Sequence, residues 1–265
     1  MLQDKYFSII YVDFALSSAF YSPCLKPACA WSFYFRVLHT SEWPDTMEST
    51  RTFTFSDEGD TMEILIPEVI DPAFGMYVWP CAPVLAQYVW FHREEIRNKH
   101  VLEIGAGTAL PGILAAKCGG IVSLSDSANY PRCLDNCRKS CEANGLRGVS
   151  IHGLTWGEFS PALLQLPPQD IILGSDCFYS TKDFEDILVT VAYLLQKMPT
   201  AEFWTTYQER SADRSIEHLL MKWKMCCRHV PLPLFEADST GIAGSTLPGN
   251  HTVHMMVITL CRDSG

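Results

Sequence analysis

Apolar and polar residues alternate in blocks along this chain, and the blocks predict strands and helices in turn. From residue 101 onward the strand-like apolar runs are VLEIGA, IVSLSD, VSIHGL, DIILGSD and EFWTTYQ. Between them, the stretches 111–118, 131–144 and 183–197 have helix-like patterns. Pro111 and Pro131 suit a first helical turn, where a missing N–H costs nothing. Strands that alternate with helices predict a doubly wound, mostly parallel α/β sheet, with its ligand beyond the strand C-termini.

The segments around this alternation predict two hairpins. RTFTF and MEILIPEV flank the acidic turn SDEGDT, which predicts a β-hairpin within 51–69. The segment 83–96 has near-helical spacing, and a further helix is expected at 215–224. After it, CCRHVPL and HTVHMMVITL predict an antiparallel pair at the sheet edge. The first 45 residues show no comparable pattern and are expected to form an N-terminal extension.

Composition narrows the class of protein. The 265 residues are 48% hydrophobic and 19% charged, which suits one α/β domain with a substantial core. The formal net charge of −10 argues against a nucleic-acid-binding surface, which needs clustered Lys and Arg. Such a charge suits a basic protein substrate, although acidity also serves solubility alone. Asp13 interrupts the apolar stretch 6–21, and no run is long enough to predict a membrane span.

The cysteines are expected to be reduced. There are eleven, with no CxxC pair among them. Cys133, Cys137 and Cys141 recur every four residues and therefore share one face of a predicted helix. No fourth ligand stands at zinc-like spacing, so we expect small core residues in place of a metal site. This pattern predicts a reducing, intracellular compartment.

The stretch VLEIGAGTALPGILAA carries the first functional signal. Gly105, Ala106 and Gly107 follow a buried strand, and glycines there permit a tight turn with backbone N–H groups close to a ligand. The dinucleotide pattern GxGxxG requires a glycine at position 110, where this chain has Leu110. The turn therefore argues against NAD.

Acidic and aromatic residues at neighbouring strand ends favour a different ligand. Glu103 is poorly placed for a pyrophosphate but well placed for a cationic amino-acid group. Asp126 ends the next strand, where an acid can accept the two ribose hydroxyls. A ribose and a cationic amino acid without phosphate describe S-adenosylmethionine. Trp156 follows the third strand and could pack on adenine, although a Trp there is more often part of the core.

Taken together, the motifs resemble the family-16 protein methyltransferases. The motifs are Trp79-Pro80 before a helix, LEIGAGTALPGILAA, Asp126, LTWG, the Asp-x-x-Tyr of 176–179, and YQERS. These relatives are seven-β-strand, S-adenosylmethionine-dependent enzymes that include lysine methyltransferases of valosin-containing protein and of chaperones. The resemblance covers about 51–260. One branch of the family is associated with arginine methylation of histone, while most relatives modify lysine.

The resemblance implies a Rossmann-like class I methyltransferase domain over 49–265 after an extension over 1–48. The domain would hold a hairpin at 51–69 and a cofactor-binding core at 80–260. Residues implied to contact the cofactor are Trp79, Gly105, Ala106, Gly107, Asp126, Trp156 and Ser175, with Glu103 as the acid of the glycine motif. Ala109 stands where relatives often have a third glycine, and Ser175 where alanine is common.

The chemistry of the methyl-accepting side chain indicates which residues would bind the substrate. A lysine must lose its proton before attack, whereas an arginine needs a carboxylate that orients its guanidinium. Asp176 is the first candidate for that carboxylate, and it could instead only cap the following helix. Glu209 is the second candidate, with a surface ion pair to Arg210 as the alternative. Tyr179, the tyrosine of the Asp-x-x-Tyr motif, could wall the channel or hydrogen-bond the substrate.

We therefore expect a protein side-chain N-methyltransferase that acts on an arginine of histone or on a lysine of another protein. Two alternatives stay open: a small-molecule methyltransferase, and a non-catalytic protein that binds chaperones or transcription factors. The intact set Glu103, Gly105, Gly107 and Asp126 counts against the non-catalytic alternative. Chaperones or transcription factors are possible partners, and no nucleic acid or membrane is expected. The mass of 29.8 kDa suits both cytoplasm and nucleus.

Overall fold

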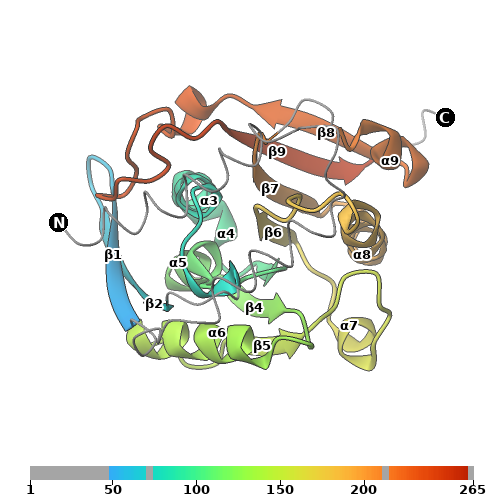
Figure 1. Cartoon of the computed structure of the whole chain (residues 1–265), viewed down its shortest axis with the longest axis horizontal. Helices are drawn as coiled ribbons and strands as arrows, with labels where there is room; N and C mark the ends of the chain where they lie inside the picture. The colour runs from blue at the N-terminus through green and yellow to red at the C-terminus, as the bar shows by residue number, and fades with distance from the viewer. Residues whose placement is uncertain (1–47, 70–73, 211–214, 262–265) are drawn as a thin grey trace, which may run out of the picture. The chain divides into compact units, whose positions relative to one another are not determined.

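The computed structural model describes residues 48–69, 74–210 and 215–261, and in them a seven-stranded sheet has the order β5-β4-β3-β6-β7-β9-β8 (Figure 1). The strands of this sheet are β3 (His100–Glu103), β4 (Ile121–Asp126), β5 (Ser150–Gly153), β6 (Ile171–Ser175), β7 (Glu202–Gln208), β8 (Met225–Val230) and β9 (Val253–Leu260). The first five are parallel, and β9 runs antiparallel to both β7 and β8. The mostly parallel sheet with an antiparallel edge pair is thereby confirmed.

Helices cover both faces of the sheet (Figure 1). They are α3 (Cys81–Phe91), α4 (Arg93–Ile96), α5 (Leu110–Lys117), α6 (Pro131–Ala143), α7 (Pro161–Gln165), α8 (Phe184–Lys197) and α9 (Glu217–Lys222), with the short 3₁₀ turns η1 (Phe74–Met76) and η2 (Leu232–Phe235). Val101 of β3 packs in the core formed by α3, α5 and α6, whereas its neighbour Leu102 packs in the core with α8. Successive apolar side chains of β3 are thus buried on opposite faces, as expected for a parallel strand covered on both sides.

The predicted N-terminal hairpin consists of β1 (Glu48–Ser56) and β2 (Thr61–Val69), paired antiparallel. Its inward side chains Phe53, Phe55, Ile64 and Ile66 are buried in the same core as α3 and α5. The hairpin is therefore part of the folded domain. The predicted extension over 1–48 lies outside the described residues, apart from Glu48. None of the helices in the described ranges is long and apolar enough to cross a membrane.

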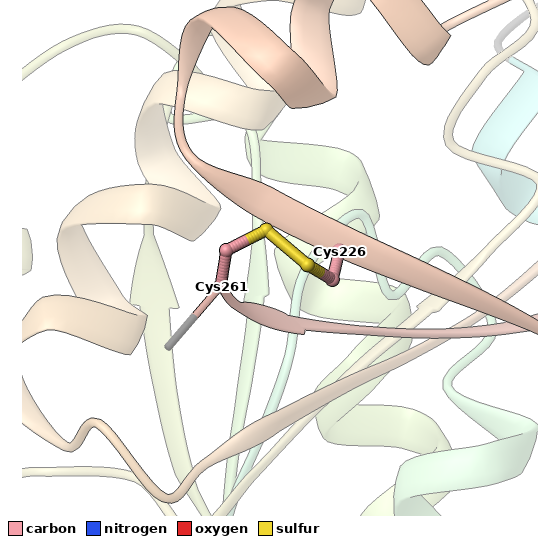
Figure 2. The surroundings of a disulfide bond; sticks show 2 residues. All are labelled: Cys226 and Cys261. Carbon is pink, nitrogen blue, oxygen red and sulfur yellow. A yellow bond between two sulfur atoms is a disulfide. The ribbon is translucent and has the colours of Figure 1, made fainter. Parts of the chain in front are cut away.

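The expectation that all cysteines are reduced is wrong at one place. Cys226, in β8, forms a disulfide with Cys261, which directly follows β9 (Figure 2). The two strands are antiparallel neighbours, so their ends meet with the Cα atoms 5.2 Å apart, within disulfide range. Sequence separation alone does not reveal this proximity. Cys133, Cys137 and Cys141 are free thiols buried along α6, as the four-residue spacing predicts.

Candidate functional site

The glycine turn lies between β3 and α5 and depends on its glycines. Gly105 and Gly107 have φ angles of +59° and +54°, which only glycine adopts readily. A side chain at Gly105 would begin 2.8 Å from the indole of Trp156, and one at Gly107 would begin 3.0 Å from the carbonyl oxygen of Gly75. Ala106, between them, donates its backbone N–H to the Ser125 carbonyl at 2.9 Å. The turn is therefore held against β4 and approached closely from two sides.

Asp126 ends β4 next to this turn. Its Oδ2 accepts the backbone N–H of Gly107 and its Oδ1 that of Ser127, both at 2.8 Å. Burial raises the pKa of the Asp126 carboxyl, while these two hydrogen bonds act in the opposite direction. A carboxylate oxygen can accept more than one hydrogen bond, so each oxygen keeps capacity for a ribose hydroxyl.

Glu103, the last residue of β3, is fully buried beneath α5. Its Oε2 accepts the backbone N–H of Gly112 at 2.9 Å, and a side chain at Gly112 would meet that oxygen at 2.4 Å. Its Oε1 is buried and has no hydrogen-bond partner among the described residues. Burial, the largest cause, raises the pKa of Glu103 to about 8. At neutral pH this carboxyl group is therefore mostly protonated until a cation faces it.

Of the aromatic residues named by the sequence, Trp156 borders the turn. Trp156 is half-buried with its indole against Gly105, and its ring centroid lies 6.4 Å from that of Tyr179. Tyr179 is 49% exposed, and burial of its remaining surface is the main reason that its pKa rises to about 12. Its phenol therefore keeps its proton at neutral pH. Trp79 packs against Tyr77, with the ring centroids 4.7 Å apart, in the stretch between η1 and α3.

Asp176 directly follows β6 and is held by several groups. It is 7% exposed, and its φ of +52° lies in the left-handed region that non-glycine residues seldom adopt. Arg210 donates from Nη1 to Oδ1 at 2.8 Å and from Nη2 to Oδ2 at 2.5 Å. The backbone N–H of Gln208 reaches Oδ1 at 3.4 Å. After burial, the nearby Asp176 carboxylate is the next cause that raises the pKa of the Cys81 thiol at the start of α3.

Asp176 is linked to the glycine turn through its neighbour. Because β6 pairs directly with β3, the residue after Asp176 reaches the turn: the Cys177 sulfur lies 3.6 Å from the position that a side chain at Gly105 would take. Ser175, the last residue of β6, is half-buried on the same strand end. The sequence-predicted residues of β3, β4 and β6 thus come together at one edge of the sheet.

Glu209 lies further along this edge. The predicted alternative, an ion pair between Glu209 and Arg210, is wrong, because the guanidinium of Arg210 pairs with Asp176. Glu209 instead contacts His254 of β9, with Oε2 and Nε2 separated by 3.1 Å. The His254 ring in turn stacks on Tyr207, with the centroids 5.0 Å apart.

Two contacts of the site were missed by sequence reasoning. Arg210 stands in the YQERS motif, but nothing in the motif shows that its side chain turns back to β6. Gly75 contacts Gly107 from η1, about thirty residues away in the chain. Within the described ranges, no group of three His, Cys, Asp or Glu side chains is arranged to hold a metal ion.

The residues present fit S-adenosylmethionine. The unpartnered Oε1 of Glu103 suits an ammonium group, because a buried acceptor without a donor is unfavourable. Gly105 and Gly107 keep the turn free of side chains, so that its backbone lies close to Trp156 and Gly75. Asp126 keeps acceptor capacity for hydroxyls. All of these groups lie at the carboxyl edge of parallel strands, where ligands of such sheets bind.

Comparisons with known proteins identify close relatives. The model of a family described as lysine methyltransferase matches residues 58–222. The histone-arginine methyltransferase METTL23 of Xenopus laevis is 64% identical over 201 residues, which cover 76% of this chain and 86% of the relative. The protein N-lysine methyltransferase METTL21A of Xenopus tropicalis is 36% identical over 118 residues, which cover 44% of this chain and 54% of that protein.

Solved structures support the fold. The 16S rRNA N2 G1207 methyltransferase RsmC of T. thermophilus, solved with AdoMet and guanosine, aligns with a TM-score of 0.51. The alignment covers 84% of this chain and 52% of that chain, at 16% sequence identity. At this identity the likeness concerns the arrangement of strands and helices alone.

Proposed function

This chain belongs to the lysine methyltransferase family whose model it matches, and from that premise we propose that it methylates a side-chain nitrogen of a basic protein. It is an S-adenosylmethionine-dependent methyltransferase. The preferred acceptor is an arginine of a histone, and the alternative acceptor is a lysine of another protein. One observation carries the proposal: the buried carboxylate of Asp176 ends the strand beside the glycine turn and already binds a guanidinium.

The cofactor side of the site is assigned to residues of three strand ends and their loops. When bound, S-adenosylmethionine supplies an electrophilic methyl group. We assign its ammonium group to Glu103, its ribose to Asp126 and its adenine to Trp156. The remaining contacts are assigned to Trp79, Gly105, Ala106, Gly107 and Ser175. Holding the cofactor by its two ends fixes the direction of its methyl group, which an in-line displacement requires.

On the substrate side, Asp176 orients the accepting nitrogen. A guanidinium is always protonated, so a carboxylate that binds two of its N–H groups fixes its plane and raises electron density on the nitrogen. Tyr179 walls the channel next to Trp156 and can donate its phenol hydrogen. Glu209 is the second candidate, although its contact with His254 draws it towards β9.

The relatives favour arginine over lysine as the acceptor. The relative at 64% identity carries the name histone-arginine methyltransferase, and the one at 36% identity carries the name N-lysine methyltransferase. Neither name supports the alternatives of a small-molecule enzyme or a non-catalytic binder.

The proposed function also concerns the protein's further partners and its location in the cell. We propose molecular chaperones or transcription factors as further partners, which affinity capture with the wild-type protein would test. We also propose that the protein is distributed between cytoplasm and nucleus, because a histone acceptor requires access to both the site of histone synthesis and chromatin. Fractionation of cells would test this distribution.

The decisive experiment is methyl transfer from labelled cofactor to purified histones by wild-type protein and Asp176→Asn. Asparagine tolerates the left-handed backbone and keeps the shape, but it loses the charge. We expect turnover to fall by about 10²-fold or more, the range for one preorganised electrostatic contact. The affinity for S-adenosylhomocysteine, measured by calorimetry, should change little. If Asp176→Asn stays fully active while Glu209→Gln is inactive, the orienting carboxylate is Glu209.

A further inference from the structure

The carboxylate assigned to the substrate is already occupied by the protein itself. Both oxygens of Asp176 accept from the two terminal nitrogens of Arg210, at 2.8 and 2.5 Å, which is the bidentate geometry of arginine with a carboxylate. The side chain of Asp176 is only 7% exposed, and the backbone N–H of Gln208 approaches Oδ1 as well. A substrate guanidinium that binds in the same bidentate geometry must therefore take the place of Arg210.

We propose that Arg210 is a built-in competitor at the acceptor site: the guanidinium of the substrate must replace that of Arg210 on Asp176, and only an acceptor with the same planar fork restores both hydrogen bonds. The inference rests on the proposed function, since it concerns the acceptor bound at Asp176.

Arginine and lysine differ in the hydrogen bonds that they can restore at Asp176. Displacing Arg210 breaks two charge-assisted hydrogen bonds at a nearly buried carboxylate, and leaving such a carboxylate unpaired is strongly unfavourable. A substrate arginine offers the same planar fork and restores both bonds, so the exchange is close to balanced. The ammonium of lysine is a compact point charge without this fork and restores the pairing less well. The cost of displacing Arg210 is the same for either acceptor, so it lowers both affinities by the same factor, and the fork alone decides the preference for arginine.

The position of Arg210 permits this exchange. Arg210 follows β7, and besides its bonds to Asp176 its Nη1 donates to the Gln208 carbonyl at 3.4 Å, a long contact that the exchange also breaks. Its side chain is 19% exposed against 7% for Asp176, so it is the more accessible partner of the pair. Release into water restores the hydration of a group that is always charged.

The first test follows Arg210 in the wild-type protein. Nitrogen-15 NMR of the arginine side chains, with Arg210→Lys to assign the signal, is recorded with S-adenosylhomocysteine and increasing amounts of arginine-containing histone-tail peptides. We expect the Arg210 side-chain signal of the free protein to move as peptide saturates the site. A signal that stays in place while the peptide binds and is methylated would overturn the exchange but leave the proposed function intact. If no peptide binds, the proposed function fails and the exchange fails with it.

The second test uses matched variants to measure how Arg210 affects the affinity for each peptide. Calorimetry gives the Kd of each arginine peptide and of the same peptide with lysine in place of arginine, for wild type, Arg210→Ala and Arg210→Lys. We expect both Kd values to fall by about tenfold or more in Arg210→Ala, because the cost of displacing Arg210 is common to both peptides, and by less in Arg210→Lys, which keeps a charge but not the fork. Arg138→Ala removes an exposed Arg–Asp pair on α6 and should leave both Kd values unchanged.

The same measurements show whether Arg210 competes with the substrate or only supports Asp176. If Arg210 only braces Asp176, both peptides bind more weakly in Arg210→Ala than in wild type, which overturns the proposal. Thermal melting is recorded for each variant, because an unpaired Asp176 can destabilise the fold. Should Arg210→Ala fail to fold, Arg210→Lys and the wild-type NMR titration still decide the question.

Discussion

Two carboxylates of the site show how surroundings decide the behaviour of one chemical group. Asp126 and Glu103 end adjacent parallel strands, and burial raises the pKa of both. Asp126 accepts two backbone N–H groups, one at each oxygen, whereas Glu103 accepts only one and keeps Oε1 unpartnered. The sequence identifies both residues as candidate ligand contacts. It does not reveal their protonation, because the pKa depends on burial and on contacts from other elements, such as the hydrogen bond from Gly112 of α5 to Glu103.

A consequence is that cofactor binding should release a proton from Glu103. Its pKa of about 8 lies above the ordinary 4.5, so the folded protein holds this proton more tightly than the unfolded chain. Stability of the free protein should therefore decrease as pH rises from about 4.5 to about 8. An ammonium group beside Glu103 favours the ionised form and expels the proton. Calorimetry near neutral pH, in buffers of different ionisation enthalpy, should show nearly one proton released per S-adenosylmethionine bound.

The matched variant for this prediction is Glu103→Gln, which keeps the size and the acceptor towards Gly112. It should bind the cofactor more weakly and release no proton in the same buffers. Proton release that persists unchanged in Glu103→Gln would assign the linkage to another group, and the ammonium contact would then be wrong.

At the scale of helices and strands, long patterned segments were predicted well and short ones were not. The strands β3, β4, β6 and β7 were predicted because their apolar side chains are buried in the two cores, whereas β5, at the sheet edge, has no fully buried residue. The five-residue α7 was missed, because its start depends on the Ser160 hydroxyl, which accepts the backbone N–H of Leu163 at 3.3 Å. The predicted helix at 83–96 is divided at His92 into α3 and α4. Long-range pairings, of Asp176 with Arg210 and of Cys226 with Cys261, appear only when the sheet is assembled.

The disulfide should stabilise the antiparallel edge. It joins residues 35 positions apart, and loop closure over that length predicts about 3–4 kcal/mol of stabilisation, which pairing of β8 with β9 reduces. Chemical denaturation of the oxidised wild-type protein should therefore show a higher free energy of unfolding than the reduced protein. Cys226→Ser should match the reduced wild type and should not respond to reductant. Equal stability of the oxidised and reduced wild type would show that the strand pairing alone holds this edge.

At the scale of the whole molecule, the net charge of −10 bears on the encounter with a basic substrate. Opposite net charges accelerate association, and salt weakens this long-range attraction while it leaves short contacts largely intact. The proposed histone acceptor is strongly basic, whereas S-adenosylhomocysteine carries no net charge at neutral pH. The two ligands should therefore respond differently to ionic strength.

We expect kcat/KM for intact histone to fall roughly tenfold as KCl rises from about 50 to about 300 mM, because screening slows the encounter. The Kd of S-adenosylhomocysteine should remain nearly constant over the same range, since the contacts proposed with Asp126 and Trp156 are local. A short, charge-neutral peptide that contains the acceptor arginine serves as the substrate control, and it should lose much less kcat/KM than histone. If histone and neutral peptide respond alike, the acidic surface does not guide the substrate. Recognition would then depend on the groups around Asp176, and the negative charge would serve solubility, which is the alternative that composition alone left open.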